Sequence, residues 1–465
     1  MAEKIWEVIR RKKMKMNTKN KVLASLEIAI VLCSMLVMAL PAISAEQNTQ
    51  EVSACTITTA SEDDYVLGVY GNANEDDTID MRDLTYVKLI FFGKKPVTKL
   101  ADAKYDGKIN PLDFIQIKLI IVGKEKELTL IDGNEQVKTF KLPIKTIVAH
   151  DDNHGEPLRM LGAEDKVVGV GSSLATHNVI LPEMSKLPIT GTWRTPDYEK
   201  ILELKPDIFM IYLKPHSMEA EEKLEPHGVH VLRLVFNIPS TMSDSIKKLG
   251  YLLGKVDEAE EFINFHEGCL DEIKERTEGL SEAAKPRVYI ETFGSYQTSP
   301  KGYKIDEIIT MAGGINIAHD LYPPPGVSVD PEWVVEQNPD IIIKEASRNC
   351  GFGVDDPKKI KAIRNEIMNR PELANVNAVK NEKVYVASSD IVRSGLQGFV
   401  WAGYCAKWFH PDLFEDLDPE SIQQGYVDRF LRIDYDLNEH GVFVYPPIEI
   451  DGGLAGIPDR YKGQI

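Results

Sequence analysis

The sequence predicts an α/β protein with two parallel-sheet α/β lobes bridged by a long helix, preceded by a small all-α module built from a duplicated loop. Three observations lead to this prediction. Apolar runs of strand length alternate with amphipathic stretches from residue 139 onward. A proline-free helical stretch, residues 256–279, separates two series of such runs. Near the N-terminus, a loop-helix unit recurs with a period of 30 residues.

The N-terminal segment, residues 1–45, is typical of a secretory signal peptide. A basic stretch precedes an uncharged, mostly apolar run from Ile28 to Ala45, which ends in small residues suited to cleavage after Ala45. An uncleaved N-terminal anchor is the alternative, because a run of this length only just reaches across a bilayer. Lipidation at Cys55, within the polar linker 46–64, is a further alternative. In each case we expect an extracytoplasmic protein, secreted or tethered to the outer face of the membrane.

Composition excludes several classes of protein. The chain has 465 residues, of which 43% are hydrophobic and 27% charged, as in a soluble globular protein rather than a multi-span membrane protein. A net charge of -18 repels phosphate backbones, so we expect no nucleic-acid partner. The cysteines beyond the signal segment lie far apart and form no CxxC pair, which indicates neither a zinc site nor a disulfide framework.

The repeat places oxygen-bearing side chains at positions 1, 5, 9 and 12 of two loops, residues 72–83 and 102–113. Such spacing wraps a hard cation, with position 7 contributing its backbone carbonyl, and calcium is the natural ion outside the cell. The predicted metal ligands are Asn72, Asn74, Asp76, Thr78, Asp80, Asp83, Asp102, Asp106, Asn110 and Asp113. An acidic linker that matches this pattern by chance is the alternative. We expect bound calcium and no catalytic cofactor.

Each loop is followed by a short helical segment, residues 84–90 and 114–120, that stops before a glycine. The two units, with aspartate rather than glutamate at position 12, resemble a dockerin module over residues 65–128. This resemblance implies calcium binding and docking to a cohesin-like surface protein. Two residues depart from the pattern, since Asp77 replaces the usual glycine at position 6 and Lys104 places a cation in the second loop. We therefore expect the second loop to bind calcium more weakly.

Two series of apolar runs predict the strands of a first lobe, residues 129–255, and of a second lobe, residues 280–437. The runs are 146–150, 167–170, 208–212 and 229–233 in the first lobe, then 288–291, 341–344 and 384–387 in the second.

The stretch between the lobes, residues 256–279, is long enough for a helix of about 36 Å. Its apolar or aromatic positions recur at helical spacing, at Ala259, Phe262, Ile263, His266, Leu270 and Ile273. A helix of this length can bridge two lobes as a stiff spine. Residues 438–465 are expected to form a C-terminal tail, glycine-rich and loose after Pro446.

Short sequence motifs in both lobes are similar to those of one protein family. Pro206-Asp207 and Pro339-Asp340 each follow a helical segment and precede an apolar run. Further matching phrases lie at 312–316, 327–333 and 406–414. Over residues 140–435 they resemble the substrate-binding protein of an ABC importer, of the spine-helix class that carries iron-siderophore complexes, haem or cobalamin. The resemblance implies capture of an iron chelate or a related metal complex and its delivery to a membrane permease.

The two lobes and the helix between them, residues 129–437, are called the body of the protein below. We do not expect an enzyme, because the body contains no nucleophile elbow, P-loop, dinucleotide fingerprint or HExxH motif. Two alternatives stay open at this point. One is a cell-surface interaction or scaffold protein that acts through the dockerin-like module. The other is a chelatase-like enzyme, which is built on a related bilobed plan.

The ligand is expected between the lobes, because ligands meet open α/β sheets at the carboxyl ends of their strands. Basic residues there would suit an anionic chelate through charge-assisted hydrogen bonds, and aromatic residues would pack against a planar ligand. Each residue alone is better explained by pairing with a nearby Asp or Glu or by half-burial in the structure, and only the convergence of several on strand-end loops favours a binding site. The predicted ligand-binding residues are Trp193, Arg194, Tyr212, Lys214, Phe293, Tyr296, Arg348 and Arg393.

Two other features have competing explanations. The segment from His150 to His154 offers imidazole and carboxylate groups to a metal, but the helix-cap explanation, with Asp151 or Asp152 as the cap after a strand, is favoured. In the importer family, one glutamate on each lobe docks into the permease, and the resemblance places these at Glu199 and Glu332. Without the resemblance, either would be an ordinary solvated glutamate near a helix start.

Overall fold

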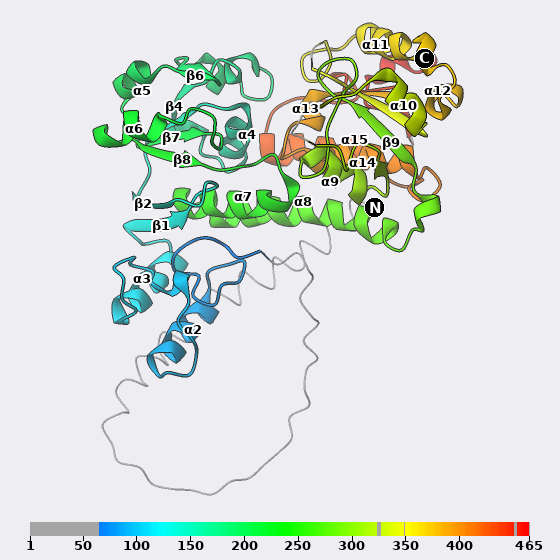
Figure 1. The fold of residues 1–465 in the computed structure, drawn as a ribbon. Helices are drawn as coiled ribbons and strands as arrows, with labels where there is room; N and C mark the ends of the chain where they lie inside the picture. The colour runs from blue at the N-terminus through cyan, green and yellow to red at the C-terminus, as the bar shows by residue number, and fades with distance from the viewer. Residues whose placement is uncertain (1–64, 323–326, 348, 451–452, 465) are drawn as a thin grey trace, which may run out of the picture. The chain divides into compact units, whose positions relative to one another are not determined.

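The computed structural model describes residues 65–322, 327–347, 349–450 and 453–464 (Figure 1). The predicted signal peptide and linker, residues 1–64, lie outside the described residues. Within the described ranges, no helix combines the length and the apolar character needed to cross a bilayer.

The repeat contains two matching helices, α2 (Met81–Phe91) and α3 (Pro111–Ile121). Each begins with a capping box, in which the first residue before the helix and an aspartate at its third position bond each other's backbone amides: Asp80 with Asp83, and Asn110 with Asp113. Reciprocal capping at the same places in both copies explains why both helices start at the end of their loops. The helices predicted after the loops are thus present. A hairpin, β1 (Glu127–Ile131) and β2 (Val137–Lys141), follows.

The first lobe is a four-stranded parallel sheet in the order β4-β3-β7-β8. The strands are β3 (Ile147–Ala149), β4 (Val167–Val170), β7 (Ile208–Ile211) and β8 (His230–Arg233), which confirms the four predicted runs. Its helices are α4 (Asp152–Met160), α5 (Tyr198–Leu204) and α6 (Ala220–Leu224), and a small antiparallel pair consists of β5 (Gly191–Thr192) and β6 (Thr195–Pro196).

The second lobe is a mixed sheet in the order β11-β9-β13-β14-β15, parallel except at β15. Its strands are β9 (Arg287–Glu291), β11 (Ile315–Asn316), β13 (Ile341–Ala346), β14 (Val384–Ser388) and β15 (Val444–Tyr445), with a separate pair β10 (Gln297–Thr298) and β12 (Val327–Ser328). The helices are α9 (Lys304–Met311), α10 (Pro331–Gln337), α11 (Lys358–Met368), α12 (Asn377–Lys380), α13 (Ser389–Val392), α14 (Gly398–Phe409) and α15 (Pro419–Tyr426).

The repeated Pro-Asp motif has the same structural role in both lobes. Asp207, just before β7, accepts hydrogen bonds from the amides of Lys145 (2.7 Å) and Thr146 (3.0 Å), at the entry to β3. Asp340, just before β13, likewise accepts a bond from the amide of Arg287 (3.0 Å), the first residue of β9. In each lobe the aspartate therefore fixes two neighbouring parallel strands at their starting ends.

The predicted spine is α8 (Val256–Thr277), preceded by α7 (Pro239–Leu253). Every position predicted to lie on its apolar face is buried. Phe262 packs edge-on against Phe430 of the second lobe, with ring centroids 5.3 Å apart, while Ser243 of α7 donates to Glu267 of α8 (2.7 Å). The same helix thus contacts elements that precede it and elements of the second lobe, as a spine must.

The expectation of a loose C-terminal tail is wrong for the described residues. β15 pairs with β14 at the edge of the sheet, and β16 (Ile448–Ile450) pairs with β17 (Gly453–Ala455). Leu454 and Ile457 are buried against Ile360 and Val442. The glycines misled the prediction because the apolar residues between them pack into a cluster with residues that are far away in the sequence, among them Ile360 and Val386.

Candidate functional site

A cavity of about 520 Å³ lies between the two lobes. Its walls come largely from the carboxyl ends of β3, β7 and β8 on one side and of β9 and β14 on the other. The first lobe contributes Asp151, Asn153, Glu156, His177, Trp193 and Tyr212 to the lining, and the second contributes Phe293, Tyr303, Lys304, Asp390, Arg393 and Ser394. The volume falls within the range of small-molecule sites.

Four of the predicted ligand-binding residues line this cavity, namely Trp193, Tyr212, Phe293 and Arg393. Three others are engaged elsewhere. Arg194 stacks on the Trp193 ring at 4.5 Å, Lys214 pairs with Glu221 at 3.3 Å, and the Tyr296 hydroxyl donates to Glu372 (2.5 Å). Arg348 lies outside the described residues.

Two aromatic side chains in the cavity wall are unusually exposed for their type. Trp193, from the first lobe, is 42% exposed, and Phe293, from the second, is 61% exposed. The Arg393 guanidinium lies 3.7 Å from the centroid of the Phe293 ring. Exposed rings on both lobes can pack against the faces of one ligand held between them.

The charge of the cavity wall is mixed rather than simply basic. Arg393 forms a bidentate ion pair with Glu345, which is almost fully buried. Asp390 accepts a hydrogen bond from the amide of Phe352 (2.9 Å), and burial raises the pKa of its carboxyl group. An anionic ligand would therefore meet cations that are already partly neutralised.

A buried glutamate that lines the cavity joins the two lobes. Glu156 of α4 accepts hydrogen bonds from the hydroxyls of Ser394 (2.8 Å) and Tyr426 (3.2 Å) and from the side-chain amide of Gln397 (3.2 Å). Burial raises the pKa of Glu156, and the three donors oppose that rise. These bonds from second-lobe residues to a first-lobe helix tie the two lobes together at the cavity wall.

Lys304, the first residue of α9, is a buried cation that interacts with Glu156 of this network. Its ammonium group donates to the backbone carbonyl of Ser394. Burial lowers its pKa to about 7, and the neighbouring Glu156 opposes this shift. Sequence reasoning did not find Lys304, Glu156 or Asp390, because they lie within or beside helices and no local pattern separates them from surface charges.

The segment from His150 to His154 forms a helix start. Asp151 accepts from the amide of Asn153 (3.1 Å) and caps α4, which supports the capping explanation. His150 is fully buried and bonded to Thr190 (3.2 Å) and to the carbonyl of Thr192 (2.8 Å). Neither histidine lines the cavity.

The two predicted permease-docking glutamates occupy equivalent places. Glu199 lies in the first turn of α5 and Glu332 in the first turn of α10, the helices that precede the two Pro-Asp turns. Both side chains are exposed. One exposed carboxylate is thus present on each lobe.

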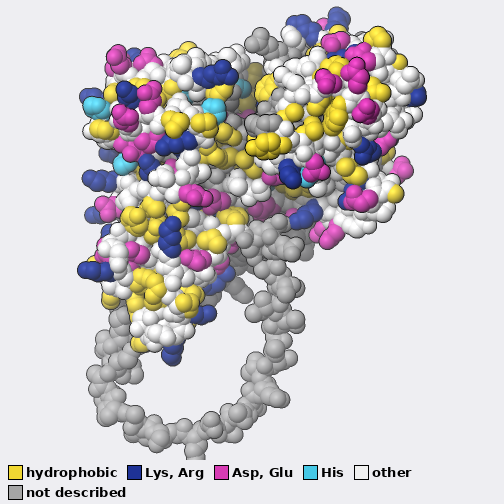
Figure 2. All heavy atoms as spheres, in the orientation of Figure 1, with side chains coloured by type: hydrophobic (Ala, Val, Ile, Leu, Met, Phe, Trp, Pro, Cys, Tyr) yellow, Lys and Arg dark blue, Asp and Glu magenta, His cyan; other side chains and the backbone are white. Residues whose placement is uncertain are grey.

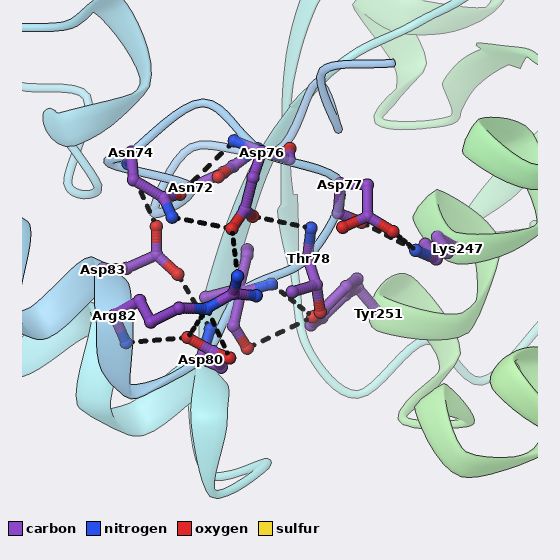
Figure 3. A network of polar contacts seen from close by, with 11 residues as sticks. Asn72, Asn74, Asp76, Asp77, Thr78, Asp80, Arg82, Asp83, Lys247 and Tyr251 are labelled. Atoms are coloured by element: carbon purple, nitrogen blue, oxygen red, sulfur yellow. Dashed lines mark hydrogen bonds and ion pairs between the residues drawn. The ribbon is translucent and has the colours of Figure 1, made fainter. Parts of the chain in front are cut away.

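The first loop of the repeat forms a polar network (Figure 3). Asp83 accepts from the amides of Asn74 (3.2 Å) and Asp80 (2.8 Å), and Asp76 accepts from the amide of Thr78 (3.0 Å). The Arg82 guanidinium lies 3.1 Å from Asp76 and 3.0 Å from Asp80. In this arrangement, no group of three or more His, Cys, Asp or Glu side chains in the described ranges is gathered to hold a metal ion.

The second loop repeats the same backbone pattern. Asp113 accepts from the amides of Lys104 (2.9 Å) and Asn110 (2.8 Å), as Asp83 does in the first loop. The Lys104 ammonium lies 3.6 Å from Glu127 of β1, so it pairs with a residue beyond the loop.

Hydrophobic side chains gather on the surface of the repeat (Figure 2). On α2, α3 and the residues that follow them, the exposed apolar side chains include Phe91, Phe92, Leu112, Ile115 and Val122. Exposed apolar residues in this number are typical of a contact surface.

Two α/β lobes, a spine helix and a cavity at the strand ends define a two-lobed solute-binding protein. The family model described as periplasmic binding protein matches residues 147–391, just over half of the chain. The protein belongs to this family, whose members bind solutes and are not catalytic. The prediction that it is not an enzyme is confirmed, and the chelatase-like alternative is wrong.

Several relatives are similar in sequence. The chain is 27% identical over 297 residues to the uncharacterized ABC transporter substrate-binding lipoprotein YvrC of Bacillus subtilis, covering 62% of this chain and 87% of the relative. It is 26% identical to the iron-uptake system-binding protein of Bacillus subtilis, over 46% of this chain and 64% of the relative. It is also 26% identical to the vitamin B12-binding protein of Pectobacterium carotovorum, over 35% of this chain and 58% of the relative.

A solved structure supports the fold. The TroA-like periplasmic binding protein FepB of Veillonella parvula superimposes with a TM-score of 0.58 at 24% identity, covering 68% of this chain and 98% of that protein. This similarity supports the bilobed α/β fold.

Proposed function

We propose that this protein is the extracytoplasmic substrate-binding component of an ABC importer, which captures an iron chelate or a related metal complex, such as a siderophore, a corrinoid or haem, and delivers it to a membrane permease. The observation that carries the proposal is the cavity between the lobes, with exposed Trp193 and Phe293 on opposite walls. Relatives named for iron uptake and for vitamin B12 binding support a metal complex as the ligand. The protein works outside the cytoplasm, secreted or tethered to the membrane.

Delivery to a permease needs a contact on each lobe. Exposed Glu199 and Glu332 occupy matching helix starts, and a pair of carboxylates can dock into permease arginines through charge-assisted hydrogen bonds. The scaffold alternative has less to support it, because the family match covers residues 147–391 and so falls on the ligand-binding body.

In the second part of the proposal, the repeat binds calcium and docks to a cohesin-like surface protein. The side-chain oxygen of Asn72, at loop position 1, is buried and has no hydrogen-bond partner, as expected of an oxygen that serves as a metal ligand. Burial raises the pKa of Asp83 to about 7, with a contribution from the neighbouring carboxylates of Asp76 and Asp80. Calcium would relieve this crowding and replace Arg82 as the counter-charge.

Ligand capture is tested on the full chain purified from its own host. Native mass spectrometry, combined with absorbance across the near-ultraviolet and visible range, would detect a co-purified metal complex and separate haem, corrinoid and ferric siderophore. Calorimetric titration with haemin, cyanocobalamin and ferrioxamine then measures affinity directly. A clean apo mass together with no heat from any of these ligands would refute the proposal.

Substitutions in the cavity wall test whether the ligand binds in this cavity. Trp193→Ala and Phe293→Ala are each expected to weaken binding of the ligand identified in this way by roughly tenfold, because each removes an aromatic wall. Tyr322→Ala is the matched control, since Tyr322 is 92% exposed and does not line the cavity. Equal affinity in all four proteins would place the ligand elsewhere.

A further inference from the structure

The first loop of the repeat is in direct contact with helix α7 of the body (Figure 3). The Tyr251 hydroxyl accepts a hydrogen bond from the amide of Ile79 (3.0 Å) and donates to the carbonyl of the same residue (3.4 Å). Tyr251 and Ile79 are each only 5% exposed. The Lys247 ammonium donates to the carboxylate (2.5 Å) and the backbone carbonyl (2.8 Å) of Asp77. One side of the first loop is therefore closed by residues of the body.

The second loop has the same spacing but lies open at the corresponding positions. Gly107, the counterpart of Asp77, has a left-handed φ of +81°, and no other atom would lie within 4 Å of an added Cβ. Asp106 and Lys108, on either side of it, are exposed. Asp77 is not among the residues with positive φ. The first loop, which has Asp77 in place of the usual glycine at position 6, therefore contacts α7 at this position, and the second loop, which keeps the glycine, does not.

The contact with Tyr251 falls beside a predicted calcium ligand. Ile79 is position 8 of the loop, and position 7, Thr78, is the residue expected to offer its backbone carbonyl. A hydroxyl that holds both the amide and the carbonyl of Ile79 restricts the backbone next to that ligand. A loop whose backbone is already ordered loses less conformational entropy when it closes around an ion.

We propose that Tyr251 is a positioning residue of the first calcium site, so that the body completes this site and calcium binds the first loop more tightly than the second. This inference rests on the proposed calcium binding of the repeat. Coupling is reciprocal: if contact with α7 strengthens calcium binding, calcium strengthens the contact of the repeat with α7 by the same factor. The Asp77–Lys247 ion pair adds no net charge near the ion, which leaves the neutral hydroxyl as the group to test.

The test measures calcium affinity of each loop in the full chain. Asp106→Ala removes a ligand of the second loop and leaves the first to be titrated, while Asp76→Ala, at the same loop position, does the reverse. In the Asp106→Ala background, Tyr251→Phe is expected to weaken calcium binding by about fivefold to tenfold, because the buried amide of Ile79 loses its acceptor. In the Asp76→Ala background, it should change nothing.

Tyr435→Phe is the matched control, since the Tyr435 hydroxyl also accepts a backbone amide, from Gly353 (3.3 Å), but lies in the second lobe. Unchanged affinity of the first loop, or equal weakening of both loops, would overturn the inference while leaving calcium binding intact. Absence of calcium binding in both backgrounds would instead refute the proposed calcium function, and the inference with it.

Hydrogen exchange provides a second measurement that does not depend on the Tyr251 variant folding. In the Asp106→Ala protein, calcium should slow exchange of amides in α7, residues 239–253, although none of them is a predicted ligand. In the Asp76→Ala protein, calcium should leave α7 unchanged. Exchange in α7 that ignores calcium in both proteins would show that the loop and the body are not coupled.

Discussion

Lys304→Met is expected to change the pH dependence of stability in a way that reports the buried amine. Lys304 is 6% exposed, and burial lowers its pKa from 10.5 to about 7. At about 1.4 kcal/mol per pKa unit, this difference means that burial disfavours the charged form by about 5 kcal/mol. Methionine is of similar length and carries no charge, so the variant removes this cost.

The sign follows from proton binding. Below pH 7, Lys304 is protonated in both the native and the unfolded state, and the native state bears the whole cost of the buried charge. Between about pH 7 and 10.5, the native amine is neutral while the unfolded one is still protonated. The unfolded state then binds more protons, so the free energy of unfolding rises with pH because of this residue.

Urea denaturation of the wild type and Lys304→Met at pH 6 and pH 9.5 measures the effect. The stability advantage of the variant over the wild type should shrink by about 3 kcal/mol between these pH values. Lys301→Met is the control, because Lys301 is exposed and its removal should give no such trend. An advantage that stays constant from pH 6 to pH 9.5 would refute the buried-amine argument.

Three further predictions concern stability measured by urea denaturation. Arg233→Met should cost about 3–5 kcal/mol, because Arg233 is fully buried, pairs with Glu221 at 2.8 Å and donates to three backbone carbonyls; a loss below about 1 kcal/mol would contradict this. Phe262→Ala, on the spine, should cost about 3–5 kcal/mol through the cavity it leaves, and an unchanged urea midpoint would contradict close packing there. Burial lowers the pKa of His266 to about 3, so as the pH falls below 6.5 the unfolded chain binds a proton that the native state does not, and the free energy of unfolding falls. The His266→Met variant should therefore lose less stability than the wild type between pH 6.5 and pH 4.5. Equal losses in the two proteins would contradict a buried neutral imidazole.

Much of the fold could be predicted because it depends on local patterns. Apolar runs bounded by turns gave the central strands of both sheets, and helical spacing gave the buried face of α8. The edge strands β11 and β15 were missed, because two residues carry no periodic signal. They pair only because a neighbouring strand offers unsatisfied backbone groups.

The candidate site was predicted less completely than the fold. Tyr212, Phe293 and Arg393 were found because they follow parallel strands, whose ends meet at one edge of a sheet, whereas Trp193 lies in the turn of the antiparallel pair β5–β6. Lys304 and Glu156 reach the same cavity from helices. Their role depends on the depth at which each helix packs, which a single sequence does not record.

By itself, the sequence determined the bilobed α/β plan, the spine helix and the duplicated loop, because each follows from spacing along the chain. Only the tertiary structure decided which charges are neutralised, as Arg393 is by Glu345 and Asp77 by Lys247. The physical reason is that an ion pair depends on distance and burial in space. In these two pairs, the partners lie 48 and 170 residues apart in the chain.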